Sequence, residues 1–376
     1  SNVLPKYGFP VDVVDLEIIS NSDEASHVEI SRDLKLAISE FAPGNEIVAN
    51  KRVWKPYALK MNPEKGWPVQ KYAICKICGR LYSYHVELGG DYSAKEKMCC
   101  GEELIYHQYV QPIFGFSTRL DDPLSSPGEK RKAKPIPSRV KFDTYMDEDM
   151  ELTECFEKKA KIGKYEAYIK YSSRGKLVIV NSCGGTGYLL CKKCGYIIQM
   201  QKNIKKNKKP EKHKSRMGRE CSNTYLTAVH LGHDFITDVV EIKLPLIDMA
   251  FDQISFWPSL LYAVIEGAAM ELGISRNEIG GCLYRADGVA LTETSIILYD
   301  DVPGGAGHVK KIAHRLAGVL ANARQKVAGG CGCGEETSCY GCLRSFENQF
   351  FHEILARGIV HKYLNKLLVE DIGVSE

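Results

Sequence analysis

Cysteine supplies the most specific chemistry in this 376-residue chain, which contains fourteen cysteines. Four of them stand close together near the C-terminus, one pair separated by one residue, the next pair by two, with five residues between the pairs. Thiolates at this density suit a closed tetrahedral Zn²⁺ site of the structural kind, with no coordination position left for water. An iron–sulfur cluster uses the same ligands, and a disulfide pair is the plainer alternative. The predicted ligands are Cys331, Cys333, Cys339 and Cys342.

Two further Cys-x-x-Cys-Gly turns predict two more metal centres, because the glycine allows the tight turn that points both thiolates inward. The first turn must pair with the adjacent Cys99 and Cys100, and both can bind one ion only if the backbone is distorted. His85 and His107 therefore compete with Cys99 for the fourth position, and a ribbon without metal is the alternative. The predicted ligands are Cys75, Cys78, Cys99 and Cys100 at the first centre and Cys191, Cys194, His213 and Cys221 at the second.

Cys183 is a reserve ligand for the second centre, although a buried thiol is the favoured interpretation. With the C-terminal knot, the three centres predict about three zinc ions per chain.

A basic segment separates the two halves of the second centre. Residues 202–219 contain nine Lys or Arg against one Glu, and a loop fixed at both ends by a metal ion is a suitable device for contacting phosphates. The alternative is a solvated, flexible loop. No aromatic residue lies among the lysines, so we expect sequence-independent contacts and no base stacking there. The predicted nucleic-acid-binding residues are Lys205, Lys206, Lys208, Lys209, Lys212, Lys214 and Arg216.

A third cluster of residues surrounds a Pro-Gly-Gly-Ala-Gly turn and the C-terminal cysteines. The turn follows a predicted strand and precedes a predicted helix, which suits phosphate binding, but it lacks the Lys-Ser/Thr of a nucleotide P-loop. A tight packing corner is the favoured interpretation, and the polar side chains nearby are expected to cap helix ends rather than to catalyse. We predict no catalytic residue. The residues of this possible site are Asp300, Gly304, Gly305, Asn348, His352 and Arg357.

Composition places the chain among ordinary globular proteins. The formal net charge is only +3, so any affinity for nucleic acid must come from local patches. Paired cysteines without a signal peptide predict a reducing, cytoplasmic location. The most apolar run, residues 254–272, is interrupted by Pro258 and Glu266 and is predicted to be a buried helix rather than a membrane span.

The elements that must position these residues predict an α+β fold. We expect a β-rich N-terminal part with two zinc-ribbon-like insertions and a C-terminal helical domain clamped by a Cys₄ zinc knot. The expected parts are 1–70 (scaffold), 71–110 (zinc ribbon), 111–235 (β-rich, with the second centre) and 236–376 (mainly helical).

Alternating residues predict strands at 11–18, 165–171 and 176–180, the last two paired through a turn at 173–175. A helix capped by Ser31, a hairpin at 47–54, a helix ending at Leu272, a capping box at 275–278 and helices over 307–327 and 345–368 are also expected. The last of these would place His352 and Arg357 on one helical face.

The stretch 300–357 resembles the C-terminal zinc-binding (MZB, MrfA-type) region of bacterial and archaeal DEAD/DEAH-box helicases, which also occurs in phage-defence proteins. The resemblance is carried by the Asp-x-x-Pro-Gly-Gly-Ala-Gly turn, the four cysteines, the Asn-Gln-x-x-His segment and Arg357. Residues 5–14 and 31–44 resemble the join that follows the helicase core, which extends the resemblance over nearly the whole chain. The initial Ser1-Asn2 is typical of a cleaved tag and predicts an excised piece of a longer protein.

This resemblance implies a non-catalytic, zinc-stabilised accessory region of a superfamily 2 DNA helicase in DNA repair or phage defence. The chain shows no Walker A or DEAD/DEAH motif, so we expect that it does not hydrolyse ATP by itself. The implied partners are DNA, single- or double-stranded, and helicase motor domains in cis or a helicase or nuclease subunit in trans. The alternative is a protein-interaction scaffold of a repair or defence complex.

Overall fold

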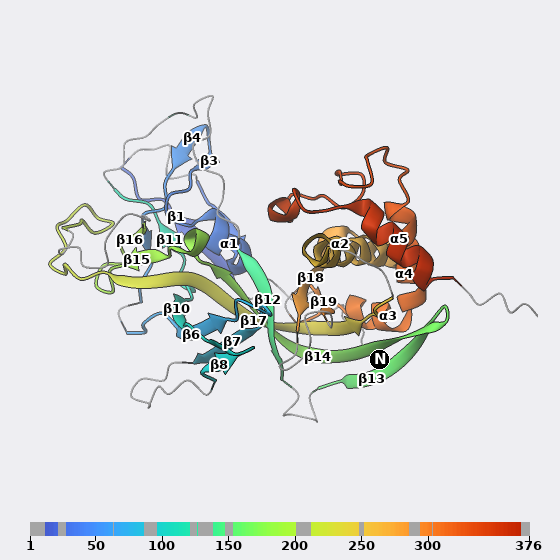
Figure 1. Cartoon of the computed structure of the whole chain (residues 1–376). Coiled ribbons are helices and arrows are strands. Elements are labelled where there is room, and N and C mark those ends of the chain that lie inside the picture. The colour runs from blue at the N-terminus through green and yellow to red at the C-terminus, as the bar shows by residue number, and fades with distance from the viewer. Residues whose placement is uncertain are drawn as a thin grey trace, which may run out of the picture.

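The structure of the whole chain is a computed structural model. It describes residues 12–21, 28–62, 64–85, 96–120, 126, 138–146, 153–200, 212–247, 252–285, 294–302 and 304–369. These residues form the predicted α+β fold, with a large sheet, a smaller sheet and a group of C-terminal helices (Figure 1).

Two long antiparallel strands, β14 (Tyr165–Asn181) and β17 (Thr227–Lys243), are the centre of an 11-stranded sheet. Strand β17 continues through residues 235 and 236, where a boundary between two parts was expected. The other strands of the 11-stranded sheet are β6 (Val69–Ile74), β7 (Leu81–His85), β10 (His107–Val110), β12 (Arg139–Tyr145), β13 (Cys155–Ile162), β15 (Tyr188–Leu190), β16 (Ile197–Gln199), β18 (Ile279–Tyr284) and β19 (Ser295–Asp300).

The predicted turn at residues 173–175 is wrong. Strand β14 runs straight through it, and the register with β17 shifts between Ser172 and Gly175, which is a β-bulge. Gly175 is required there, because a Cβ on it would lie 2.3 Å from a methyl carbon of Val239. The two predicted strands therefore do not pair with each other, since each finds a longer partner in β17.

The smaller elements agree with most of the local predictions. A four-stranded sheet has the order β2-β1-β11-β5, and two hairpins complete the strands. Their bounds are β1 (Val13–Glu17), β2 (Ser31–Asp33), β5 (Ala58–Leu59), β11 (Phe116–Ser117), β3 (Ile47–Ala49) with β4 (Arg52–Trp54), and β8 (Met98–Cys99) with β9 (Glu102–Glu103).

The helices follow local capping signals. Helix α1 is capped by Asp33 rather than by Ser31, and the Asp252 carboxylate caps α2. The capping box at Ser275 and Glu278 is present. The helices are α1 (Leu34–Glu40), α2 (Gln253–Leu272), α3 (His308–His314), α4 (Leu316–Val327) and α5 (Arg357–Leu367), with 3₁₀ turns at Cys183–Gly185, Arg276–Glu278 and Gln349–Phe351. No helix among the described residues is long and apolar enough to span a membrane.

The helix predicted over 345–368 is wrong in its first half. Residues 345–356 contain only a 3₁₀ turn, and α5 begins at Arg357. Side-chain hydrogen bonds replace the helical ones here: the Ser345 N–H donates to Asn348 Oδ1 at 2.8 Å and Asn348 Nδ2 donates to the Leu343 carbonyl at 2.8 Å. His352 and Arg357 consequently do not share a helical face.

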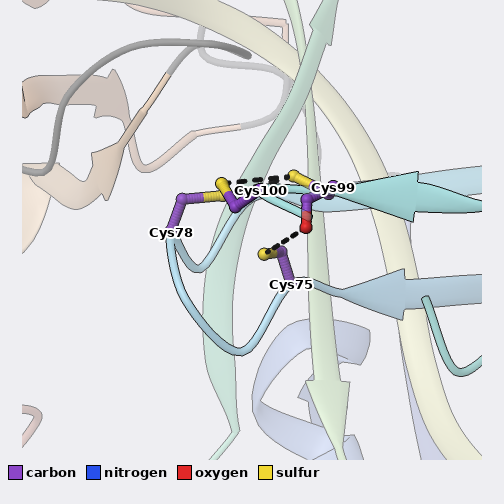
Figure 2. A group of neighbouring side chains, drawn as sticks. All are labelled: Cys75, Cys78, Cys99 and Cys100. Atoms are coloured by element: carbon purple, nitrogen blue, oxygen red, sulfur yellow. Dashed lines mark hydrogen bonds between the residues drawn. The ribbon is translucent and has the colours of Figure 1, made fainter. Parts of the chain in front are cut away.

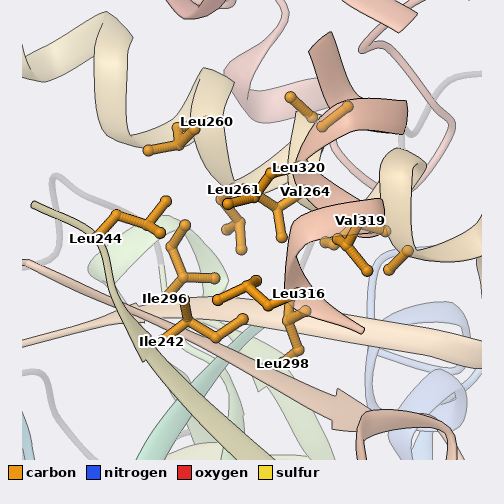
Figure 3. Packing of buried hydrophobic residues seen from close by; sticks show 14 of the residues in the cluster. Ile242, Leu244, Leu260, Leu261, Val264, Ile296, Leu298, Leu316, Val319 and Leu320 are labelled. Carbon is orange, nitrogen blue, oxygen red and sulfur yellow. The ribbon is translucent and has the colours of Figure 1, made fainter. Parts of the chain in front are cut away.

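Two main cores pack against different halves of the long strands. The larger core joins the first half of β14 and the second half of β17 to helices α2, α3, α4 and α5. Figure 3 shows Ile242, Ile296 and Leu298 of the strands packed with Leu261, Val264 and Leu316 of the helices. The other core joins the remaining halves of these strands to α1 and the small sheet, with Trp54 and Phe116 buried in it. The same two strands thus belong to both cores.

Candidate metal centres and nucleic-acid interface

The fold brings the twelve predicted metal ligands together as three groups of four. In each group one ligand atom per residue lies within 4.8 Å of the others, although members such as Cys191 and Cys221 are thirty positions apart in the sequence. The groups are Cys75, Cys78, Cys99 and Cys100; Cys191, Cys194, His213 and Cys221; and Cys331, Cys333, Cys339 and Cys342.

The sulfur separations match a zinc tetrahedron. With Zn–S bonds of about 2.3 Å, the edges of a ZnS₄ tetrahedron are about 3.8 Å long. The sulfur–sulfur distances are 3.6 Å for Cys78–Cys99 and 3.9 Å for Cys191–Cys221. In the third group they are 3.4, 3.8 and 3.9 Å. All fourteen cysteines are free thiols, so the disulfide alternative is not formed. The three groups fit about three zinc ions.

At the first centre two adjacent cysteines, Cys99 and Cys100, join the same group of four thiols (Figure 2). Strands β8 and β9 are joined by a two-residue turn, Cys100 and Gly101, in which both residues have positive φ angles (53° and 79°). Such a type I′ turn lets Cys99 end one strand while the Cys100 side chain returns to the same side. The backbone distortion expected from the sequence is therefore the positive φ angle of Cys100. His107 stacks on His230 instead, with ring centroids 5.1 Å apart.

The second centre repeats the knuckle geometry of the first. Gly195 donates its N–H to the Cys191 carbonyl at 3.0 Å, as Gly79 does to Cys75 at 2.9 Å. The returning ligands lie on a small hairpin in which the Cys221 N–H donates to the His213 carbonyl at 3.0 Å. Cys183 lies outside this group, and burial raises the pKa of its thiol.

The third centre is bound to the helices around it by Arg357. This side chain is 8 % exposed, donates to the Cys333 carbonyl from Nε (2.9 Å) and Nη2 (2.7 Å), and donates to the Val327 carbonyl from Nη1 (3.2 Å). A backbone N–H from Cys333 lowers the pKa of Cys331 to about 7, which favours the thiolate that a metal needs. Arg357 thus joins the end of α4, the cysteine knot and the start of α5.

Asp300 fills the glycine turn that had suggested a phosphate site. Its carboxylate is fully buried and accepts the backbone N–H groups of Ala306 (2.6 Å), His308 (3.1 Å) and Val309 (2.9 Å). The amide groups that an anion would need are already bonded within the chain. Gly305 is confined as well, because a Cβ on it would lie 2.3 Å from the Asp238 carboxyl carbon. Gly304 has a φ of 79° and open space around it.

The basic residues predicted for nucleic-acid contact are described only in part. Lys205, Lys206, Lys208 and Lys209 lie outside the described residues. Lys212 and Lys214 are exposed, whereas Arg216 forms an ion pair with Glu17 at 2.5 Å.

Three exposed cations at the second centre were not among the predicted binding residues. Lys192 and Lys193 lie inside the knuckle, and Arg219, which was counted in the basic segment but not selected, lies two residues before Cys221. Their positions between and beside the metal ligands were the available signal. Together with Lys212 and Lys214 they are the exposed cations of the knuckle and the hairpin that carry this centre, a set hereafter called the zinc-2 face; Glu220 is an exposed acidic residue on the same hairpin.

An α+β fold with three cysteine-rich groups of four ligands defines a zinc-binding protein with sites for about three ions. Within it, residues 260–343 match the family model of the MrfA Zn-binding domain (MZB). The match contains the glycine turn and all four cysteines of the third centre, and it confirms the resemblance predicted from them. Asn348, His352 and Arg357 lie beyond its end.

Further comparisons extend along the chain. The Druantia protein DruE of Escherichia coli (strain UMEA 4076-1) is 25% identical over 401 aligned positions, which cover 94% of this chain and 21% of that protein. The chain therefore spans about a fifth of the length of this curated relative. Among solved structures, the DUF1998 helicase MrfA bound to DNA aligns with a TM-score of 0.38 and 11% identity over 94% of this chain and 34% of that chain. The same helicase bound to DNA and AMPPNP aligns with a TM-score of 0.33 and 11% identity, over 93% of this chain and 31% of that chain.

Proposed function

We propose that this chain is a non-catalytic, zinc-stabilised accessory region of a superfamily 2 DNA helicase that contacts nucleic acid and braces the motor in repair or phage defence. The observation that carries the proposal is the zinc-2 face, where exposed cations are fixed on a metal-anchored knuckle and hairpin. Lys193 Nζ lies 2.5 Å from Ser222 Oγ, and the backbone of the 213–221 hairpin is closed at Lys214 and Glu220.

The physical reason is that the backbone carrying these cations has already lost its conformational entropy when the chain folds. A flexible lysine loop loses conformational entropy when it grips a phosphate backbone, whereas a metal-anchored hairpin has lost it on folding. Phosphate contacts of this kind carry no sequence information and weaken steeply with salt. The matching family model is the zinc-binding domain of MrfA. This match supports the part of the proposal that makes the chain an accessory region of a helicase.

Charge reversal at the zinc-2 face tests the proposal. Lys192→Glu with Lys214→Glu and Arg219→Glu should weaken DNA binding at low salt. The slope of log affinity against log salt should fall by about 1 for each phosphate that is no longer neutralised. Reversal of Lys205, Lys206, Lys208 and Lys209 tests the remainder of the loop. Both are measured by fluorescence anisotropy in a salt series.

A matched control reverses three lysines at the opposite end of β14. Lys159, Lys161 and Lys164 are exposed on and beside β13, so Glu at these positions changes the net charge equally. DNA affinity should change little in this control. Equal losses in both variants would indicate an effect of net charge alone and would contradict the proposed interface.

A second candidate function, a protein-interaction scaffold, is favoured by the aromatic residues around the third centre. Tyr340 is 68 % exposed, Phe346 75 % and Phe350 43 %, and exposed aromatic clusters are typical of protein interfaces. Phe346→Ala should then reduce copurification with a coexpressed helicase or nuclease subunit while DNA affinity is unchanged. Unchanged copurification would remove this candidate.

A further inference from the structure

Tyr225 is the most exposed of the large apolar and aromatic side chains among the described residues, at 79 %. Its backbone is nevertheless fixed. Asn223 Oδ1 accepts the Tyr225 N–H at 3.1 Å, Asn223 Nδ2 donates to the Tyr225 carbonyl at 3.2 Å, and the same Nδ2 lies 3.4 Å from Cys191 Sγ. One amide side chain therefore joins the tyrosine to a predicted zinc ligand.

The next residues strengthen this attachment. Strand β17 begins at Thr227, which pairs with Leu190 of β15 immediately before Cys191. The chain is thus held on both sides of Tyr225, while its ring stays open to solvent. A ring presented in this way loses little conformational entropy when it binds a flat partner, because only its two side-chain torsions remain to be ordered.

The surroundings of Tyr225 define what such a partner carries. Lys193 Nζ lies 2.5 Å from Ser222 Oγ, three residues before the tyrosine. Lys192 precedes Lys193 in the knuckle. Arg219 and Lys214 extend from the hairpin that ends at Cys221. The partner must therefore combine negative charge with an exposed flat ring.

We propose that Tyr225 is a stacking platform for an unpaired base of single-stranded nucleic acid whose phosphates lie against the zinc-2 face. An aromatic ring beside a row of cations is the combination by which proteins hold single strands without reading their sequence. In a duplex both faces of an internal base are covered by its neighbours, so an exposed tyrosine gains little from it. The inference rests on the proposed function and specifies the form of nucleic acid that the site takes.

The sequence had indicated the opposite, because no aromatic residue lies within the 202–219 segment. The tyrosine comes from outside that segment, and Asn223 and the pairing of β15 with β17 attach it to the second centre.

The test compares three labelled probes of equal length, an oligothymidine, a duplex and an abasic single strand, on the 376-residue chain. Tyr225→Ala should lower affinity for the oligothymidine roughly 5- to 150-fold, the range expected for one stacked base. Affinities for the duplex and the abasic strand should change less than about twofold, and the salt slope should stay the same.

Three variants complete the design. Tyr225→Phe should retain the affinity, since the ring remains. Tyr340→Ala removes a tyrosine that is 68 % exposed at the third centre and should have no effect. Tyr225→Trp should show tryptophan emission that the oligothymidine quenches and the abasic strand does not.

The outcomes separate the inference from the function on which it rests. Wild-type affinity of Tyr225→Ala for the oligothymidine, together with weak binding of the charge-reversal variant, overturns stacking and leaves the proposed function standing. An equal loss on the abasic strand also overturns stacking, because no base is then involved. Full affinity of the charge-reversal variant for every probe, or no binding by the wild-type chain, overturns both.

Discussion

At the scale of the residue, the turn at the second metal centre depends on a glycine, because a residue with a Cβ does not fit there. Gly195 has a φ of 79°, and a Cβ on it would lie 2.1 Å from the Leu59 carbonyl oxygen. Gly184, in the adjacent 3₁₀ turn, has a φ of 65° and nothing within 4 Å of its Cβ position. Both positions demand the left-handed region, but only the first is also crowded.

Gly195→Ala should therefore cost more than Gly184→Ala. The crowded site combines left-handed strain with a backbone clash, and we expect a loss of about 2–5 kcal/mol in the free energy of unfolding. The open site should lose only about 1–2 kcal/mol. Urea denaturation with zinc analysis measures the loss of stability in each variant. Equal losses in the two variants would show that the contact with Leu59 is unimportant.

His230 gives a pH dependence at the same scale. Its burial, and secondarily the charge of His107, lower its pKa to about 4, and its Nδ1 hydrogen-bonds the Tyr72 hydroxyl. Between an unfolded pKa of about 6.5 and the folded value, only the unfolded chain binds this proton. Stability should therefore fall as pH falls through this window, by at most about 3 kcal/mol.

The check is urea denaturation of the wild-type chain and of His230→Gln from neutral pH to about pH 4.5. Acid also releases zinc, because the thiolates become protonated, so the readout is the difference between the two proteins. The variant should lose less stability on acidification. Parallel curves would mean that His230 does not titrate as described.

At the scale of the element, the third centre replaces regular structure between α4 and α5. Residues 328–356 contain no α-helix, and Cys342 and Leu343 insert into the helical core. The Arg357 N–H donates to the Thr337 carbonyl at 3.0 Å, which sets the start of α5 against the knot. The cysteine knot thus lies where the two helices meet, and Arg357 joins it to both.

Cys342→Ser should lower the zinc content from about three to about two ions and accelerate hydrogen exchange in both α4 and α5. Cys183→Ser is the matched control, since Cys183 is a buried thiol outside the three groups. It should keep about three ions and normal exchange. Loss of protection in the loop alone, with both helices unaffected, would contradict the clamp.

At the scale of the whole molecule, the long strands and one ion pair connect the two cores. Strands β14 and β17 contribute to both cores, and Lys35 at the start of α1 forms a salt bridge with Asp301 after β19. Burial lowers the pKa of Lys35 to about 8. Neither core can unfold without exposing apolar residues of the strands that the other needs.

We therefore expect a single cooperative unfolding transition. Trp54 reports on the core of α1 and the small sheet, and Trp257 on the helical core. Variants that retain only one of these two tryptophans, with Trp67 replaced in both, should show urea midpoints that coincide after correction for the stability of each variant. Separate transitions would show that the shared strands do not couple the cores.

Much of this protein was readable from short stretches of sequence. The knuckles, the Cys₄ knot, the hairpin at 47–54 and the capping box depend on residues a few positions apart, and local geometry follows directly from such spacing. The α+β class followed from hydrophobic periodicity.

Other features were decided only by the tertiary structure, because they depend on partners distant in sequence. Residues 173–175 look like a turn until β17 offers a longer partner, and 345–356 look helical until Asn348 bonds the backbone of the knot instead. Exposure is likewise a property of the folded chain. Tyr225 is an ordinary tyrosine in the sequence, and only the folded chain attaches it through Asn223 to Cys191 of the second centre and leaves its ring exposed.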